Sequence, residues 1–221
     1  MISMFLFCGC LCGQYKSMTV PAGTKIIDNF PPSERYMYPQ FVEGQVILQN
    51  GLTSACIINY NLLRDDMEFI QDNDTVTITR KRDLKYVIAD SDTFIYMPGY
   101  AKHIYGDKLK IYCKDRIYLK EILKRGAMGA VNRTAAIGSF SDFEAQSIPY
   151  NLVVPEDYVF KREVSYHIAT SRGTFEPFKK NNILKLFSYH KSDINKYLKA
   201  NKINFDKQED VIKLAEYLST L

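Results

Sequence analysis

The 221-residue chain has no tryptophan, only three histidines and none of the short motifs that identify common enzymes. It contains no Gly-x-Ser-x-Gly elbow, no Walker loop and no glycine pattern for dinucleotides. Its histidines, His103, His167 and His190, lie at no metal-ligand or triad spacing from one another, from a cysteine or from a catalytic acid. The sequence therefore predicts no catalytic, cofactor-binding or metal-binding residue.

A strong excess of one charge is also missing. Lys and Arg total 29 against 25 acidic residues, for a formal net charge of +4, and both signs are mixed along the chain. Proteins that bind nucleic acid usually carry a basic stripe or a block of like charges. The sharpest basic cluster, Arg80-Lys81-Arg82, is typical of a solvated turn. We therefore expect no nucleic-acid partner.

The chain lacks an apolar run of the roughly 20 residues that a transmembrane helix needs. Its first thirteen residues, MISMFLFCGCLCG, are nevertheless uncharged and mostly apolar, which suits the hydrophobic region of a secretory signal peptide. Cleavage after Cys12 would leave small residues, Cys12 and Cys10, at the last and third-last positions of the signal. We therefore predict a signal peptide at 1–13 and export to the periplasm, to the cell envelope or into the medium.

Two alternatives to ordinary secretion stay open for this segment. Gly9 precedes Cys10 as in a lipoprotein signal, although Phe7 stands where leucine is usual, so Cys10 is a candidate for lipidation and for membrane attachment through the lipid. The segment could instead be a buried or disordered terminus. Signal peptides normally begin with a basic residue, and here the first one is Lys16, which favours a translation start upstream of Met1.

Cysteine is scarce beyond this segment. Only Cys56 and Cys113 remain, and each lies on the apolar side of an alternating pattern, so both thiols are expected to point inward. If their strands are neighbours, an oxidising compartment would allow a disulfide between them. Two unpaired core thiols are the alternative.

What the chain does have is a series of short segments in which apolar and polar residues alternate. Segments 44–49 and 54–60 flank Asn50 and Gly51, a pair that predicts a type I′ hairpin turn, and Gly106-Asp107 predicts a second hairpin. Other strands are expected at 65–70, 75–80, 85–89, 93–97, 100–105, 108–114, 116–121, 152–154 and 163–169. The predicted fold is mainly β within the α+β class, an antiparallel meander that forms a barrel-like or sandwich sheet.

This pattern divides the chain into four parts. The proline-punctuated residues 14–40 are predicted to be an extended leader, and 41–175 an antiparallel β domain. Within that domain, the small and mixed residues of 124–146 predict a long loop, which is the expected place for a binding or lid role. Residues 176–221 are predicted to be a helical tail.

Apolar residues recur at helical intervals in that tail. They predict three short helices, at 182–187, 192–199 and 206–218. Ser192 is the expected cap of the middle helix, and Asp206 with Glu209 forms the expected capping box of the last.

Two acidic pairs invite a metal interpretation. Asp72 with Asp74 and Asp90 with Asp92 each place two carboxylates two residues apart, but the glycine and terminal glutamate of a calcium loop are missing. Because aspartate favours turns for backbone reasons, both pairs predict turns and no calcium site.

Residues spread along the chain resemble a group of secreted proteins from Bacteroidota-type bacteria. They are Tyr38-Pro39, Phe41, Gly44, Asn50-Gly51, Asn59-Tyr60-Asn61, Asp65, Met67, Phe69 and, in the tail, Leu184-Lys185-Leu186-Phe187. The likeness covers residue 36 to the C-terminus and implies export and a β domain with a helical tail. No activity is established in the group, so it carries over no functional residue.

These observations favour a secreted or envelope-associated protein that is a non-enzymatic binding or structural module. Sixteen tyrosines supply amphipathic area with which a sheet or loop could contact a protein or a surface glycan. The alternative is a hydrolase whose active site is assembled from distant segments. The structure can distinguish these two interpretations. A hydrolase requires His103 or His167 to share a concave pocket with an acid and a serine, and histidines on a convex face would argue against it.

Overall fold

The computed structural model describes residues 17–72, 74–125, 131–135, 151–170 and 173–221. The described residues form one antiparallel β-sheet and a few short helices near the C-terminus, which confirms the predicted α+β, mainly β class. The predicted signal peptide at 1–13, the lipidation candidate Cys10 and residues 126–130 and 136–146 of the predicted loop lie outside the described residues.

The sheet has twelve strands, and ten of them follow the order β1-β11-β9-β8-β7-β6-β2-β3-β4-β5. The other two strands, β10 and β12, pair with β9 and β11. The path is open, since β1 stands at one end and β5 at the other. The strands are β1 Met18–Val20, β2 Val42–Leu48, β3 Thr53–Asn61, β4 Asp66–Gln71, β5 Asp74–Thr77, β6 Leu84–Ala89, β7 Asp92–Tyr96, β8 Tyr100–Tyr105, β9 Ile111–Arg125, β10 Val131–Ala135, β11 Asp157–Ala169 and β12 Phe175–Pro177.

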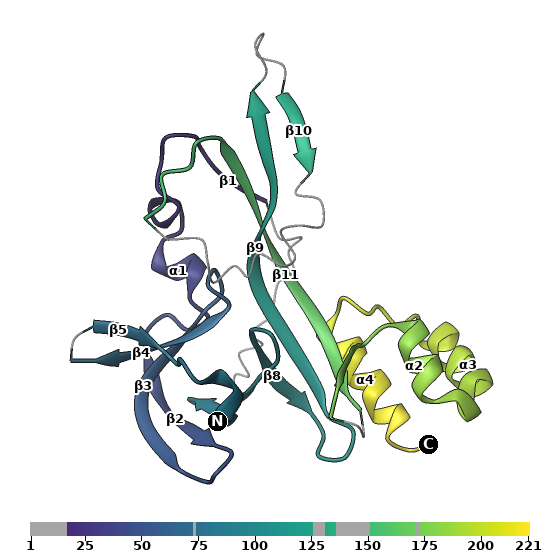
Figure 1. The fold of residues 1–221 in the computed structure, drawn as a ribbon. Coiled ribbons are helices and arrows are strands. Elements are labelled where there is room, and N and C mark those ends of the chain that lie inside the picture. Colours follow the sequence, from purple (N-terminus) through teal and green to yellow (C-terminus); the bar gives the residue numbers. More distant parts are fainter. Residues whose placement is uncertain (1–16, 73, 126–130, 136–150, 171–172) are drawn as a thin grey trace, which may run out of the picture.

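Strands β9 and β11 form a long twisted ribbon through the middle of the molecule (Figure 1). The sequence predicts two strands, 108–114 and 116–121, where the structure has the single strand β9. Asp115 does not interrupt it, because Asp115 pairs with Val164 in the ladder with β11. The predicted loop at 124–146 is also wrong at its start, since β9 continues to Arg125 and β10 pairs with its end. The backbone of residues 121–125 forms hydrogen bonds with the neighbouring strands, so this segment is a strand although its sequence does not alternate.

The predicted hairpin between β2 and β3 exists, but its turn differs from the expected one. Of Asn50 and Gly51, only Gly51 has a positive φ, +86°. The loop of Gln49, Asn50 and Gly51 is closed by the N–H of Gly51, which donates to the carbonyl of Leu48 at 3.0 Å. This is a three-residue loop with glycine in the left-handed region and not a type I′ turn.

The leader supplies part of the sheet and of the core. Its strand β1 pairs with β11, and its side chains Val20, Ile26 and Phe30 are buried. Two short helices complete it, η1 Ile27–Asn29 and α1 Pro32–Arg35. The strand expected at 152–154 is reduced to one bridge, between Val153 and Lys25.

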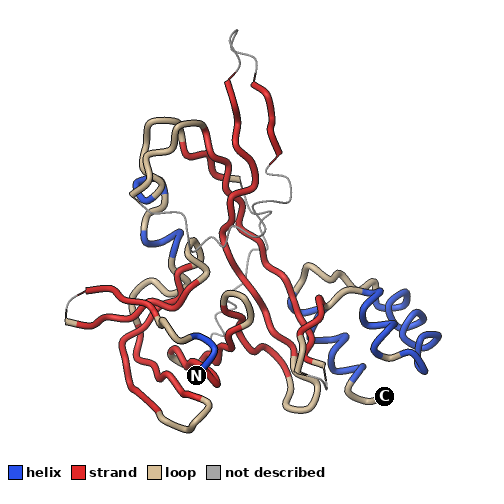
Figure 2. Tube along the Cα trace, viewed as in Figure 1, coloured by secondary structure: helices blue, strands red, loops and turns tan. Residues whose placement is uncertain are grey.

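Three helices form the tail as predicted: α2 Lys180–Leu186, α3 Lys191–Asn201 and α4 Gln208–Leu218. They gather at one end of the β9–β11 ribbon, where Figure 2 shows them in blue. The turn η4, Ser188–His190, joins α2 to α3, and η2, Lys81–Asp83, precedes β6. No helix of the described segments has both the length and the apolar character needed to cross a membrane.

The predicted helix caps are wrong. The N-cap positions are His190 for α3 and Lys207 for α4, and neither side chain caps its helix. Asp206 precedes the cap of α4, and its own N–H is held by Oδ1 of Asn204 at 2.9 Å. Ser192 lies inside α3. Helix α3 therefore begins one residue before its predicted cap, and α4 begins two residues after its own.

Three hydrophobic clusters include residues of the β9–β11 ribbon: two large ones, and a small one around Met97, Ala101 and Tyr112. The main core joins the leader, β2 to β8 and the upper part of the ribbon, including Ile117, Leu119 and Phe160. The tail core joins the three helices to the other part of the ribbon; its buried members include Ile111, Tyr166, Ile168, Phe178, Ile183, Ile194, Val211 and Leu214.

Candidate functional site

Two of the three histidines, His103 and His167, have identified polar neighbours. His167 and Ser165 share one face of β11, as their alternation predicts, and Nε2 of His167 lies 3.1 Å from Oγ of Ser165. Burial lowers the pKa of His167, and the positive charge of Lys114 lowers it further. Nε2 of His103 is 2.7 Å from the carbonyl of Gly106. None of three cavities, of about 900, 700 and 570 Å³, is lined by a histidine. The hydrolase reading thus has one serine–histidine contact without a concave pocket around it.

The two cysteines of the body of the chain are free thiols. Cys56 is on β3 and Cys113 on β9, and β2, β6, β7 and β8 lie between these strands in the sheet. The strands are not neighbours, so the proposed Cys56–Cys113 disulfide does not form and the alternative of two unpaired thiols holds. Burial raises the pKa of Cys113 to about 12 and also raises that of Cys56.

Each acidic pair joins a turn to a strand: Asp72 and Asp90 lie in turns, and Asp74 and Asp92 begin β5 and β7. Asp72 and Asp90 have positive φ values of +48° and +53°, which suits aspartate in tight turns. Asp92 accepts a hydrogen bond from the hydroxyl of Tyr38 at 2.8 Å and lies 3.4 Å from Nζ of Lys102. Across the described residues, no three histidine, cysteine or acidic side chains gather to hold a metal ion.

Sequence reasoning missed a group of buried acids at the turn between β3 and β4. Asp65 accepts hydrogen bonds from the hydroxyl of Tyr60 at 2.5 Å and from the N–H of Tyr100 at 3.2 Å. Nζ of Lys114 lies 2.9 Å from its other carboxylate oxygen and also contacts the carbonyl of Pro98. This contact joins the β3–β4 turn to β9.

Two further buried acids, Asp66 and Glu68 on β4, have partners of their own. Nζ of Lys81 is 2.7 Å from Asp66, whose pKa is raised by burial against the lowering effect of that lysine. Glu68 accepts hydrogen bonds from Tyr36 at 2.6 Å, and from Asn61 and Arg64, both at 3.1 Å. Burial and the bond to Glu68 raise the pKa of Tyr36 to about 12. Each carboxylate is compensated locally, so the group holds the fold together and offers no reactive acid.

The sequence does contain a signal for this group. Asp65, Asp66 and Glu68 stand between Leu63, Met67 and Phe69, and acids that interrupt an apolar stretch need partners when the stretch is buried. The partners Lys81 and Lys114 come from distant strands or turns, so local pattern alone does not identify them.

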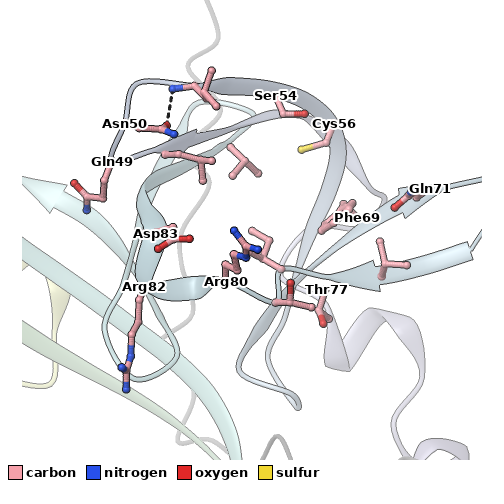
Figure 3. Close-up of a pocket in the computed structure, with 16 residues that line it drawn as sticks. Gln49, Asn50, Ser54, Cys56, Phe69, Gln71, Thr77, Arg80, Arg82 and Asp83 are labelled. Atoms are coloured by element: carbon pink, nitrogen blue, oxygen red, sulfur yellow. Dashed lines mark hydrogen bonds between the residues drawn. The ribbon is translucent and has the colours of Figure 1, made fainter.

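A cavity of about 900 Å³ lies between the β2–β3 hairpin, strands β4 and β5, and the segment that leads through η2 to β6 (Figure 3). We call it the β2–β5 cavity. Five of its lining side chains also pack against the main core and are only half-buried: Val46, Leu48, Cys56, Phe69 and Ile78. The cavity is therefore an open end of the main core with an apolar floor.

The mouth of the β2–β5 cavity is polar and basic. Arg80, Arg82 and Asp83 line it, and Leu52 at the hairpin tip is 65% exposed. Figure 3 shows Arg80 within the space between the two hairpins, whereas the side chain of Arg82 points away from it. No ion pair involves either arginine within the part of the chain that the structure describes.

The predicted solvated turn at 80–82 is therefore only partly correct. Arg80 and Arg82 are exposed, but Lys81 is turned inward to Asp66, and its Nζ lies 5.9 Å from the ring centroid of Tyr96. Of the three basic residues, Lys81 faces the protein interior, and the two arginines line the cavity.

Comparison of the chain with protein-family models, curated proteins and solved structures finds no match.

Proposed function

We propose that this protein is a non-enzymatic binding module that takes an apolar ligand into the β2–β5 cavity. The observation that supports the proposal is the half-exposed apolar floor, which is continuous with the main core. Ligand sites are typically concave, of about 300–1,000 Å³, and mainly apolar with a few polar groups. The β2–β5 cavity has this size and composition.

The physical reason is the cost of exposed apolar surface. Burial of apolar area contributes about 25 cal/mol per Å². Side chains such as Leu48 and Phe69 gain only part of that free energy, because they face the main core on one side and open space on the other. An apolar ligand would complete their burial.

Binding is tested with Nile red, a neutral dye that fluoresces in apolar surroundings, on the purified full chain. Val46→Trp fills the cavity and should abolish the fluorescence increase. Ile57→Trp is the matched control, because Ile57 is on the same sheet, is 43% exposed and does not line this cavity. A cooperative thermal unfolding transition is the check that each variant is folded. Equal dye binding by wild type and Val46→Trp would contradict the proposal.

We also propose that the module works outside the cytoplasm, on the strength of the apolar segment 1–13. Fractionation of the native host with N-terminal sequencing and lipid labelling tests this. We expect an exported chain that begins near Gly13, or a lipid on Cys10 in the lipoprotein alternative. Protein kept in the cytoplasm with Met1 intact would contradict export.

The second candidate, a hydrolase, is favoured by one observation, the 3.1 Å contact between Ser165 and His167. A fluorophosphonate probe labels activated serines. Labelling that is lost in Ser165→Ala would favour the hydrolase, whereas we expect no labelling of wild type.

A further inference from the structure

We propose that the ligand of the β2–β5 cavity is a single-chain amphiphile whose negatively charged head group binds Arg80. This inference rests on the proposed function, because it assigns the chemistry of the ligand held in the same cavity.

The apolar part of the ligand follows from the floor. Val46 and Leu48 on β2, Phe69 on β4 and Ile78 just after β5 lie around one space and are all half-buried. These four side chains offer no charged group and no hydroxyl, so the part of the ligand that packs on them is apolar.

The head group follows from Arg80. Its side chain lies in the space between the two hairpins that bound the cavity (Figure 3), and no described acid forms an ion pair with it. A guanidinium presents five N–H donors in a planar fork that matches a carboxylate with two parallel hydrogen bonds. An anion above an apolar floor would therefore be complementary to both the charge and the shape of the site.

The charge of the head group is limited by Asp83. This carboxylate lines the same mouth, so a head group with several negative charges would be repelled. The two arginines and one aspartate that line the cavity carry a net charge of +1, which a single negative charge on the head group balances.

The size of the site favours a small molecule over a protein partner. Sixteen residues line the cavity, and a stable protein interface uses about 20–30 residues on each side. A chain inserted end-on needs no wider surface than the cavity offers.

The test is isothermal titration of the purified full chain with dodecanoate and with dodecanol, which share the chain and differ in charge. We expect dodecanoate to bind about tenfold more tightly, since a hydrogen bond to a charged group contributes at least that factor. Arg80→Gln should remove the difference and leave dodecanol binding intact. Arg82→Gln is the matched control and should keep the difference.

A third ligand, lysophosphatidylglycerol, separates two sources of the same chemistry. Tighter binding of dodecanoate identifies a free carboxylate, and tighter binding of the lysolipid identifies a membrane lipid; both support the inference if Arg80→Gln weakens them. Equal affinity for dodecanoate and dodecanol in wild type would overturn the inference and leave the proposed function standing. Failure of both to bind, together with failure of Nile red, would overturn the two together.

Cys56 locates the ligand within the molecule. It lines the cavity, whereas Cys113 packs in the tail core. Dodecanoate should slow alkylation of Cys56 by iodoacetamide severalfold and leave the rate at Cys113 unchanged, as read by peptide mass spectrometry. Unchanged alkylation of Cys56 at saturating ligand would place the bound chain elsewhere and overturn the inference.

Discussion

At the scale of the residue, buried charge explains several details of this chain. Asp65 adopts a positive φ of +51° at the end of the β3–β4 turn, and its carboxylate meets Tyr60, Lys114 and the N–H of Tyr100. Burial of a carboxylate costs free energy unless hydrogen bonds and a countercharge compensate it. The compensation at Asp65 requires space, and Gly99 provides it.

Gly99→Ala should unfold the protein readily. A Cβ at this position would lie 2.0 Å from Oδ2 of Asp65, and the glycine has a φ of +89°. We expect a loss of about 3 kcal/mol or more in the free energy of unfolding by urea, since steric overlap adds to backbone strain. Gly23→Ala is the control: its φ is +81° and nothing lies within 4 Å of its Cβ, so it should lose about 1 kcal/mol. Equal losses would show that the carboxylate of Asp65 moves aside freely.

His167 should make stability depend on pH in the weakly acidic range. Burial holds its pKa below the ordinary value of 6.5, so the unfolded chain takes up a proton first as the pH falls. The free energy of unfolding should therefore decrease as the pH drops below about 6.5. His167→Gln should show a smaller decrease between pH 7 and pH 5.5 in urea unfolding. An identical decrease in the variant would assign the pH dependence to other groups.

At the scale of the element, alternation predicts strands well and their ends poorly. The strand β8 coincides with its predicted range, 100–105, because Gly106 with its φ of +72° ends it locally. Strand β9 runs through Asp115 because Arg162 on β11 binds that carboxylate with two hydrogen bonds, of 2.8 and 2.6 Å. A charged residue inside a strand is thus satisfied by a partner 47 positions away, which no local pattern shows.

The tail helices depend on the tail core. They have seven, eleven and eleven residues, and isolated helices shorter than about 12–15 residues are marginal in water. The rings of Tyr197 and Tyr217 stack at 3.9 Å and join α3 to α4. The apolar stripe found in the sequence is therefore a docking face, and the helices form because they dock.

Leu214→Ala tests this dependence. Leu214 is fully buried in the tail core, and we expect a loss of about 2–5 kcal/mol in the free energy of urea unfolding with reduced helical circular dichroism. Ile212→Ala on the same helix is only half-buried and should lose clearly less. Equal effects of the two substitutions would mean that α4 does not dock through its buried face.

At the scale of the whole molecule, the β9–β11 ribbon contributes side chains to both large hydrophobic clusters, the main core and the tail core. Phe160 and Leu119 lie in the main core, Ile111 and Ile168 in the tail core, and the ion pair of Arg162 and Asp115 lies between them along the ribbon. Beside it, Lys114 binds Asp65 and contacts the carbonyl of Pro98, so one side chain joins β9 to two turns of the main core.

Lys114→Met should therefore destabilise the whole molecule. Removal of one partner of a buried ion pair typically costs about 3–5 kcal/mol, because the other charge stays buried and unpaired. The double variant Lys114→Met with Asp65→Asn should recover part of that loss, which urea unfolding measures as a double-mutant cycle. Lys120→Met is the control: the Lys120 side chain is 47% exposed and its Nζ lies 3.5 Å from Oε1 of Glu121, so this pair contributes at most about 1 kcal/mol. Additive losses in the cycle would contradict the coupling.

The sequence by itself determined the fold class, the positions of most strands, the three tail helices and the inward direction of Cys56 and Cys113. These properties depend on the spacing of apolar residues, which is local, and on the need to bury them. Only the tertiary structure decided that β3 and β9 are far apart, that Lys81 and Lys114 compensate buried acids, and that the main core stays open beside Arg80. These properties depend on which distant segments become neighbours, and a strand carries no local record of its partner.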